Sequence, residues 1–247
     1  MHRFFIPRES LRDGQVEFSL EQAHQISKVL RLHRGDEVAV LDNGGWMYNV
    51  ELSEVSSGLV RGLVRRRHLA PGEPRTKLTL YPALLKSDKL EFVLQKCTEV
   101  GVSAFVPILS DRCNVGGSAS DEKLGRWERI IAESAEQCER GRLPRLHPIT
   151  FYSVACEQAR GLTFIACERG PRENLRREIA TRVDGRGRRP FALNLFVGPE
   201  GGYTDAEIDE AISRGIIPIG LGPRILRAET ASVVGATLLL AYAGDLE

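Results

Sequence analysis

The sequence predicts an α/β domain that follows a small and mostly β domain. Before residue 70, short apolar segments alternate with turn signals, whereas after residue 75 apolar strands alternate with helical patterns. Ala70-Pro-Gly-Glu-Pro74 separates the two regions, and two prolines in five residues sustain neither period. The length of 247 residues, with 42% hydrophobic and 27% charged residues, is typical of globular proteins and excludes a wholly disordered chain. We therefore expect domains at residues 1–72 and 75–247.

The first domain carries one helix signal and one hairpin signal. Ser19-Leu-Glu-Gln22 is a capping box, which predicts a helix to about residue 31 with Ile26, Val29 and Leu30 on its buried face. Asp42-Asn-Gly-Gly45 predicts a tight turn, because Asn-Gly accepts positive φ angles. Small antiparallel sheets usually close into a barrel to hide their edges. The strands are expected at residues 3–6, 37–41, 46–52 and 59–66.

The second domain reads as a parallel sheet covered by helices on both faces, because its strands are continuous apolar runs. One helix is expected from Ser87 to Val100, ended by Gly101, and a longer one over residues 121–140, ended by Gly141. The strands are expected at residues 78–84, 105–109, 162–167, 193–197 and 216–221.

Charge and composition exclude several functional classes. The 34 basic and 33 acidic residues leave a net charge of +1, so any nucleic-acid binding must come from local patches. Arg65, Arg66 and Arg67 form one such patch, which is equally well explained as a phosphate contact or as a solvated strand end. No apolar run reaches the roughly 18 residues of a membrane helix. The five cysteines form no CxxC pair, which favours reduced thiols in the cytoplasm, and the five histidines are not spaced for a metal.

Val197-Gly-Pro-Glu-Gly-Gly202 has the layout of a ligand-binding loop. It follows an apolar strand and precedes a second capping box, Thr204-Asp-Ala-Glu207. Ligands of open α/β sheets bind at the carboxyl ends of strands, and glycines there let a ligand approach the backbone. The segment is neither a Walker loop nor a dinucleotide fingerprint, and by itself a tight strand–helix turn explains it equally well.

A second segment of this kind, Leu221-Gly-Pro-Arg-Ile-Leu-Arg-Ala-Glu-Thr-Ala231, follows the next strand. We expect Ile225 and Leu226 to anchor it and to turn Arg227 inward. Charged Arg227 and Glu229 beside a very apolar helix are costly unless they are paired or used. Glu229 and Thr230 are alternatively explained as helix caps, and Thr230 as both a cap and a pocket residue.

Together the two segments describe one pocket for a medium-sized polar ligand. No nucleophile is evident, since Cys167 at a strand end has no histidine placed to activate it and reads as a core residue. A reaction driven by proximity and electrostatics on an activated co-substrate fits best. A Rossmann oxidoreductase would need an early G-x-G-x-x-G after the first parallel strand, and residues 83–87 do not provide one.

The two glycine segments resemble the signature pair of the RsmE family, ribosomal small-subunit RNA uridine-N3 methyltransferases of the SPOUT superfamily. The resemblance covers nearly the whole chain. It extends to His24-Gln-Ile-Ser-Lys-Val-Leu-Arg31, Lys96-Cys-Thr-Glu-Val-Gly-Val102, Ser110-Asp-Arg-Cys113 and Ala135-Glu-Gln-Cys-Glu-Arg-Gly-Arg-Leu-Pro144.

The resemblance implies a PUA-like RNA-binding barrel at the N-terminus and an α/β methyltransferase domain with a deep trefoil knot. It also implies a homodimer through the knotted domain, small-subunit ribosomal RNA or the assembled subunit as partner, and S-adenosylmethionine as cofactor. The cofactor would bind bent among the loop after Cys167 and the two glycine segments. The residues implied for it are Cys167, Val197, Gly198, Pro199, Glu200, Gly201, Gly202, Leu221, Gly222, Ile225, Leu226, Arg227, Thr230 and Ala231.

For the chemistry, our hypothesis is that Arg227 and Arg112 stabilise the uracil oxygens and that Glu229 positions N3 or takes its proton. Gln137 and Arg140 would hold RNA across the dimer, and an equal alternative is that they cap and pair on the long helix. The competing function is an RNA-binding module of the same fold without catalysis. The intact glycine segments argue against it, because a protein without catalysis would not need the pocket.

Overall fold

The computed structural model describes residues 1–114, 120–168, 173–181 and 191–246. The chain forms two compact units, which we describe separately. The smaller unit contains Met1–Glu73 and Ala135–Leu143, and the larger contains Pro74–Ser134 and Pro144–Glu247. The division falls at the predicted linker, but the smaller unit also takes in residues 135–143, which the sequence boundaries had left in the second domain.

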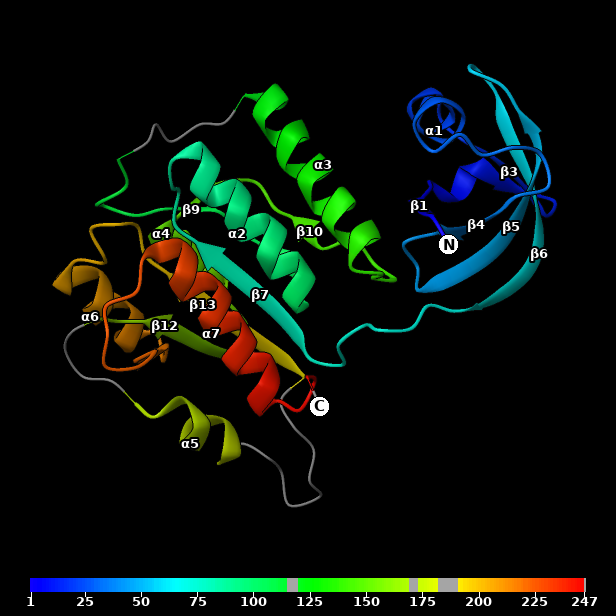
Figure 1. Ribbon diagram of the computed structural model, residues 1–247. Coiled ribbons are helices and arrows are strands. Elements are labelled where there is room, and N and C mark those ends of the chain that lie inside the picture. The colour runs from blue at the N-terminus through cyan, green and yellow to red at the C-terminus, as the bar shows by residue number, and fades with distance from the viewer. Residues whose placement is uncertain (115–119, 169–172, 182–190, 247) are drawn as a thin grey trace. The chain divides into compact units, whose positions relative to one another are not determined.

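The smaller unit is built on a curled six-stranded sheet with the order β1-β4-β5-β6-β3-β2 (Figure 1). β1 runs parallel to β4, and the other pairs are antiparallel. The predicted hairpin is confirmed, because Leu41 pairs with Met47 and Asn43 has a φ of 55°. The strands are β1 (Arg3–Phe5), β2 (Leu11–Arg12), β3 (Gln15–Glu17), β4 (Glu37–Leu41), β5 (Trp46–Val55) and β6 (Val60–Leu69).

The helix of the smaller unit begins as predicted and then changes its pitch. Both hydrogen bonds of the Ser19–Gln22 capping box are present at the start of α1 (Leu20–His24). The following turn, Gln25–Val29, is π-helical, and this wider turn shifts the phase of the helix. Ile26 is therefore buried, but Val29 is 66% exposed, so its predicted place on the buried face is wrong.

The larger unit contains a parallel sheet with the order β10-β8-β7-β13-β12-β14, as predicted for this class. The single strand expected at residues 105–109 is instead two short strands on either side of Val106 and Pro107, and the second of them pairs with β11 in a separate sheet. The strands are β7 (Lys77–Pro82), β8 (Ala104–Phe105), β9 (Ile108–Leu109), β10 (Arg145–Leu146), β11 (Thr150–Phe151), β12 (Leu162–Ala166), β13 (Ala192–Val197) and β14 (Ile217–Ile219).

Helices cover both faces of this sheet. One face packs with α2, α3, α5 and α7, and the other with α4 and α6. Gly101 ends α2 in the left-handed conformation, with a φ of 116°, as predicted. The longer helix ends at Gln137 rather than at residue 140, since Glu139 already has a φ of 62°. The bounds are α2 (Ser87–Val100), α3 (Asp121–Gln137), α4 (Tyr152–Gln158), α5 (Leu175–Ala180), α6 (Asp205–Ser213) and α7 (Ala228–Tyr242).

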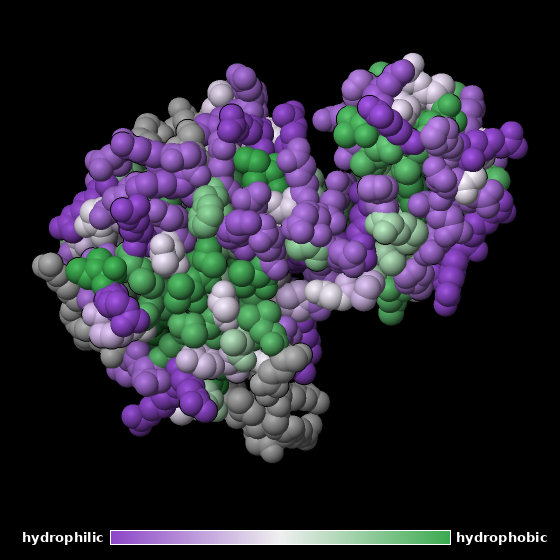
Figure 2. Space-filling model, in the orientation of Figure 1, coloured by the Kyte–Doolittle hydropathy of each residue, from purple (hydrophilic) through white to green (hydrophobic). Residues whose placement is uncertain are grey.

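α2 and α7 lie side by side on the larger unit and carry apolar side chains on their outer surface (Figures 1 and 2). Phe92 of α2 is 45% exposed, and Tyr242 at the end of α7 is also exposed. In the described part of the chain, no helix combines the length and the apolar character needed to cross a bilayer.

Candidate active site

Three strand ends of the larger unit meet at one edge of the sheet. β12 lies between β13 and β14, so the segments after Cys167, Val197 and Ile219 share the carboxyl edge. The Cys167 amide donates to the Ile219 carbonyl at 2.9 Å, which closes this edge. The two glycine segments are thus brought together as the sequence predicted. The loop after Cys167 continues into residues 169–172, which lie outside the described residues.

The first glycine segment is a closed turn packed on an aromatic ring. The Gly202 amide donates to the Pro199 carbonyl at 2.9 Å, and Gly202 has a φ of 66°. A Cβ on Gly198 would stand 3.2 Å from the Tyr203 ring, which is closer than most Cβ contacts, so a side chain there would crowd the ring. The Tyr203 hydroxyl is buried without a hydrogen-bond partner among the described residues, and burial raises the pKa of Tyr203 well above its usual range.

Arg112 lies against this glycine turn. Its Nη1 donates to the Gly201 carbonyl at 2.9 Å and to the Tyr203 carbonyl at 3.2 Å. A Cβ on Gly201 would stand 3.3 Å from Arg112 Cβ and Cδ, which is closer than ordinary contact. Arg112 therefore lies against the first glycine segment, with its guanidinium directed at the backbone of the loop.

Lys89 of α2 also lies at the site, through its contact with Glu200, and no pattern in the sequence pointed to it. Lys89 Nζ lies 2.8 Å from a carboxylate oxygen of Glu200, and both side chains are about one-third exposed. This hydrogen bond lowers the pKa of Glu200 and raises that of Lys89. Glu229 and Arg227 also act electrostatically on Lys89, so all four charges lie at one place.

The second glycine segment is open. Gly222 has a φ of 118°, and no described atom lies within 4 Å of the position that its Cβ would take. Ile225 is 67% exposed and Arg227 is exposed, so the expectation that Ile225 anchors the loop and turns Arg227 inward is wrong. The reason is that the first buried residue after the strand is Ala228, the first residue of α7.

The first residues of α7 carry polar side chains that do not cap the helix. Arg227 occupies the N-cap position, with no side-chain hydrogen bond to the helix, so neither Glu229 nor Thr230 takes the cap role weighed for them. Glu229 Oε2 is buried and has no hydrogen-bond partner among the described residues. Thr230 is exposed and Ala231 is half-buried. An unpaired buried carboxylate oxygen is costly, which points to a donor supplied by a ligand.

The arginines expected to contact RNA lie on the smaller unit. Arg65 pairs with Glu51 at 2.9 Å, and the Arg67 guanidinium lies 3.8 Å from the centre of the Trp46 ring. The side chain of Arg66 has no hydrogen-bond or ion-pair partner among the described residues. All three are exposed on β6.

Gln137 and Arg140, also expected at the RNA, differ from each other in their surroundings. Gln137 is exposed at the end of α3. Arg140 is 4% exposed and forms an ion pair with Glu73, whose carboxylate also accepts from the Gly141 and Arg142 amides. Burial of the Glu73 carboxyl raises its pKa, but these bonds outweigh that effect and the pKa is lowered.

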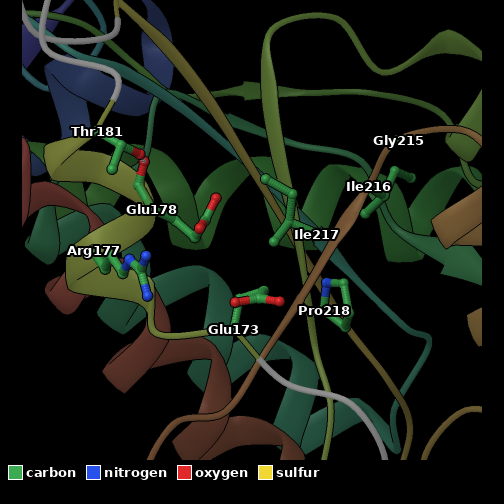
Figure 3. A pocket seen from close by; sticks show the side chains of 8 residues that line it. All are labelled: Glu173, Arg177, Glu178, Thr181, Gly215, Ile216, Ile217 and Pro218. Atoms are coloured by element: carbon green, nitrogen blue, oxygen red, sulfur yellow. Dashed lines mark hydrogen bonds between the residues drawn. The ribbon is translucent and has the colours of Figure 1, made fainter.

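Two hollows in the surface of the larger unit do not include the residues expected to bind the cofactor. One, of about 470 Å³, lies beside α5 and β14, where Glu173, Arg177 and Pro218 face one another (Figure 3). The other, of about 530 Å³, includes Tyr81 and Asn194. Among the described residues, no group of three or more His, Cys, Asp or Glu side chains could hold a metal ion.

Comparison with known proteins identifies the family. The sequence profile of the RNA methyltransferase domain matches residues 72–240. The ribosomal RNA small subunit methyltransferase E of Synechocystis sp. is 35% identical to this chain, over 94% of the chain and 75% of its own length. The chain belongs to this methyltransferase E family.

Other members of the methyltransferase E family are similar to this protein over nearly the whole chain. The Bacillus subtilis member is 32% identical over 94% of this chain and 93% of its own length. A crystal structure of the Neisseria gonorrhoeae member bound to S-adenosylmethionine superposes with a TM-score of 0.84 at 27% identity, and it covers 98% of this chain and 97% of that one. The α/β fold described above is therefore that of the methyltransferase E family.

Proposed function

We propose that this protein transfers a methyl group from S-adenosylmethionine to N3 of a uridine in small-subunit ribosomal RNA. One observation carries the proposal. A closed glycine loop faces an open one at the carboxyl edge of the sheet, with exposed Arg227 and the unpaired Glu229 oxygen beside them. The family relatives that are named small subunit methyltransferases, and the cofactor-bound relative, support both the substrate class and the cofactor.

The residues present fit the cofactor. Free space in front of Gly222 lets a ligand approach the backbone, and exposed Ile225 offers an apolar surface to a flat ring. Glu229 Oε2, which has no hydrogen-bond partner among the described residues, leaves an acceptor for the substrate beside this surface. We assign the cofactor to Cys167, to residues 197–202, and to Leu221, Gly222, Ile225, Leu226, Arg227, Thr230 and Ala231.

The cofactor supplies a methyl group on a sulfonium, so no covalent intermediate on the protein is needed. Uridine N3 carries a proton and is a poor nucleophile at neutral pH. Negative charge therefore builds on the uracil oxygens as that proton leaves, and the guanidinium groups of Arg227 and Arg112 stabilise it. Glu229 lies two residues from Arg227 and positions N3 or accepts its proton.

The larger unit is proposed to carry the trefoil knot and to form the homodimer. In support of the knot, α7 follows edge strand β14 but packs on β13 and β7, so the chain crosses back over β12. In support of the dimer, the outer surface of α2 and α7 is apolar and exposes Phe92. A contiguous apolar surface of this kind is typical of a protein interface.

The smaller unit is proposed to be the PUA-like RNA-binding domain of a cytoplasmic protein. Arg66 has no hydrogen-bond or ion-pair partner among the described residues, so its charge is available to a phosphate, and Arg65 and Arg67 flank it on the same strand. Gln137 is exposed and free to contact RNA. Arg140 contributes through its pair with Glu73, which fixes the segment that carries Gln137.

The test is mass spectrometry of nucleosides from small-subunit ribosomal RNA of cells that lack this protein. Loss of 3-methyluridine, restored by the wild-type gene and not by an Arg227→Ala gene, is expected. Unchanged 3-methyluridine would reject the proposed reaction. An RNA-binding module without catalysis would in addition show no calorimetric binding of S-adenosylmethionine.

A further inference from the structure

We propose that Glu207 is a positioning residue for methyl transfer: its buried carboxylate ties the Ser110–Cys113 turn to the first glycine segment and so holds Arg112 in place. From its sequence pattern, Glu207 is only the last residue of a helix capping box. The inference rests on the proposed function for its catalytic consequence, whereas its structural part concerns this chain alone.

Glu207 is 5% exposed, and both oxygens of its carboxylate accept hydrogen bonds. Oε2 accepts from the Thr204 amide at 2.8 Å and from the Thr204 hydroxyl at 3.1 Å, which completes the capping box. Oε1 accepts from the Asp111 amide at 3.0 Å, 96 residues away in the sequence. The Glu207 carbonyl in turn accepts from the buried Tyr152 hydroxyl at 2.6 Å. A buried carboxylate held in this way has little freedom to move.

Asp111 directly precedes Arg112 in the chain. The hydrogen bond from the Asp111 amide to Glu207 therefore fixes the backbone from which the Arg112 side chain extends to the glycine loop. Ser110–Cys113 is a tight turn, closed by the Cys113 amide and the Ser110 carbonyl at 3.1 Å. Arg112 leaves this turn and donates to the Gly201 and Tyr203 carbonyls. Glu207 therefore links the Ser110–Cys113 turn to the start of α6, directly after the glycine segment, and Arg112 links the same turn to the segment itself. Loss of the Glu207 link leaves Arg112 on a turn that is less firmly fixed.

A capping role alone does not require a carboxylate. Glutamine serves equally well at this position of a capping box, and α1 of this protein uses Gln22. The distinguishing property of Glu207 is that both of its side-chain oxygens accept hydrogen bonds. In Glu207→Gln one of them becomes an NH₂ group, so if the cap is kept, a donor faces the Asp111 amide.

The first experiment compares Glu207→Gln with Thr204→Ala, which weakens the same cap but leaves the bond to Asp111. Hydrogen exchange of amides 198–203 in the cofactor-free protein reports the loop directly. We expect at least fivefold faster exchange and at least fivefold weaker S-adenosylmethionine binding in Glu207→Gln. We expect neither change in Thr204→Ala, which should lose only melting temperature.

The second experiment removes the amide donor itself. Asp111 occupies the second position of the turn, where proline is well tolerated, so Asp111→Pro deletes the N–H with the turn kept. Asp111→Ala loses the same exposed carboxylate but keeps the N–H, and it is the matched control. Exchange of amides 198–203 should be faster in the proline variant than in the alanine variant. Single-turnover methyl transfer at saturating cofactor should be slower, with RNA affinity equal in both.

Two results would overturn the inference. Either Glu207→Gln behaves as wild type or as Thr204→Ala in loop exchange and cofactor affinity, or Asp111→Pro and Asp111→Ala show the same loop exchange. Failure of the proposed function has a different signature. The wild-type protein would then transfer no methyl group to ribosomal RNA, while the loop-exchange comparison would still decide whether Glu207 holds the loop.

Discussion

The two glycine segments at the sheet edge differ in how the protein holds them. Residues 198–202 are fixed from three directions, by Arg112, by Lys89 through Glu200, and by the ring of Tyr203. In the other segment, residues 222–225 are all exposed, and no described atom lies within 4 Å of the position that a Cβ of Gly222 would take. The first glycine segment is therefore already held in one conformation without a ligand. We expect the second segment to make its contacts with the cofactor and the RNA. Preorganisation lowers the cost of binding, whereas an exposed loop can respond to RNA.

The largest effect is expected in the open segment, from Arg227→Ala. If this guanidinium meets the uracil, its loss should lower the single-turnover rate by about two orders of magnitude, as for loss of an oxyanion donor. Cofactor affinity should fall far less, and Arg227→Lys should recover only part of the rate because an ammonium lacks the planar fork. Normal single-turnover rates would remove Arg227 from the catalytic residues. A joint loss of cofactor binding and melting temperature would instead mean that Arg227 holds the loop.

Gly201→Val tests the preformed side. Its Cβ would press on Arg112 Cβ and Cδ, so the loop and Arg112 cannot both keep their places. Overpacking of this kind costs about 1–3 kcal/mol, which corresponds to a loss of cofactor affinity of roughly 5- to 150-fold by calorimetry. The variant should remain folded, with the oligomeric state of the wild-type protein, by light scattering. Normal cofactor affinity would show that binding does not require the conformation that residues 198–202 have in this structure.

Gly222→Ala tests the open side with a smaller change. A side chain at a φ of 118° is strained, although there is space for it. The strain costs about 1–2 kcal/mol, and a severalfold loss of cofactor affinity is expected. Gly215→Ala is the matched control, because Gly215 also has a positive φ and open space but lies after α6. Equal effects of the two variants on cofactor binding would contradict the assignment.

The smallest effect concerns the Lys89–Glu200 pair. Lys89 lowers the pKa of Glu200 in the folded protein. The pair therefore contributes to folding stability above the unfolded-state pKa of about 4.3, and this stabilisation is lost as the pH falls through the lower folded-state pKa. Lys89→Met should raise the pKa of Glu200 toward its ordinary value in an NMR titration. It should also make amide exchange of the loop at neutral pH slightly faster. A pKa of Glu200 that does not move would show that Lys89 is not its partner in solution.

The sequence predicted the parts of this site that depend on local pattern. Both glycine segments, the capping box at Thr204 and the parallel strands were found from spacing alone, because turns and strand periods leave local signals. Lys89 and the second role of Glu207 were not found, since each depends on a partner about a hundred residues away. The exposure of Arg227 was also missed, because the local Ile225-Leu226 pair suggested an anchor that tertiary packing does not use.

The fold shows the same limit. The π-helical turn that exposes Val29 leaves only a weak local signal. The break of one strand at Pro107 does leave a signal, because proline cannot donate to a strand ladder, and the sequence interpretation overlooked it. The placement of residues 135–143 in the smaller unit leaves none, because it depends on Glu73 accepting from Arg140, Gly141 and Arg142.

That placement has a consequence for synthesis on the ribosome. When Glu73 emerges, the residues that will satisfy its carboxylate have not yet been translated, and neither has Glu139, the partner of Arg3. About 70 more residues must be added before Leu143 is made, which takes roughly 4–14 s at about 5–20 residues per second. During this interval all six strands of the smaller unit have been synthesised, but its last segment has not. The part of the protein that is made first therefore completes its folding only after much of the next unit has been synthesised.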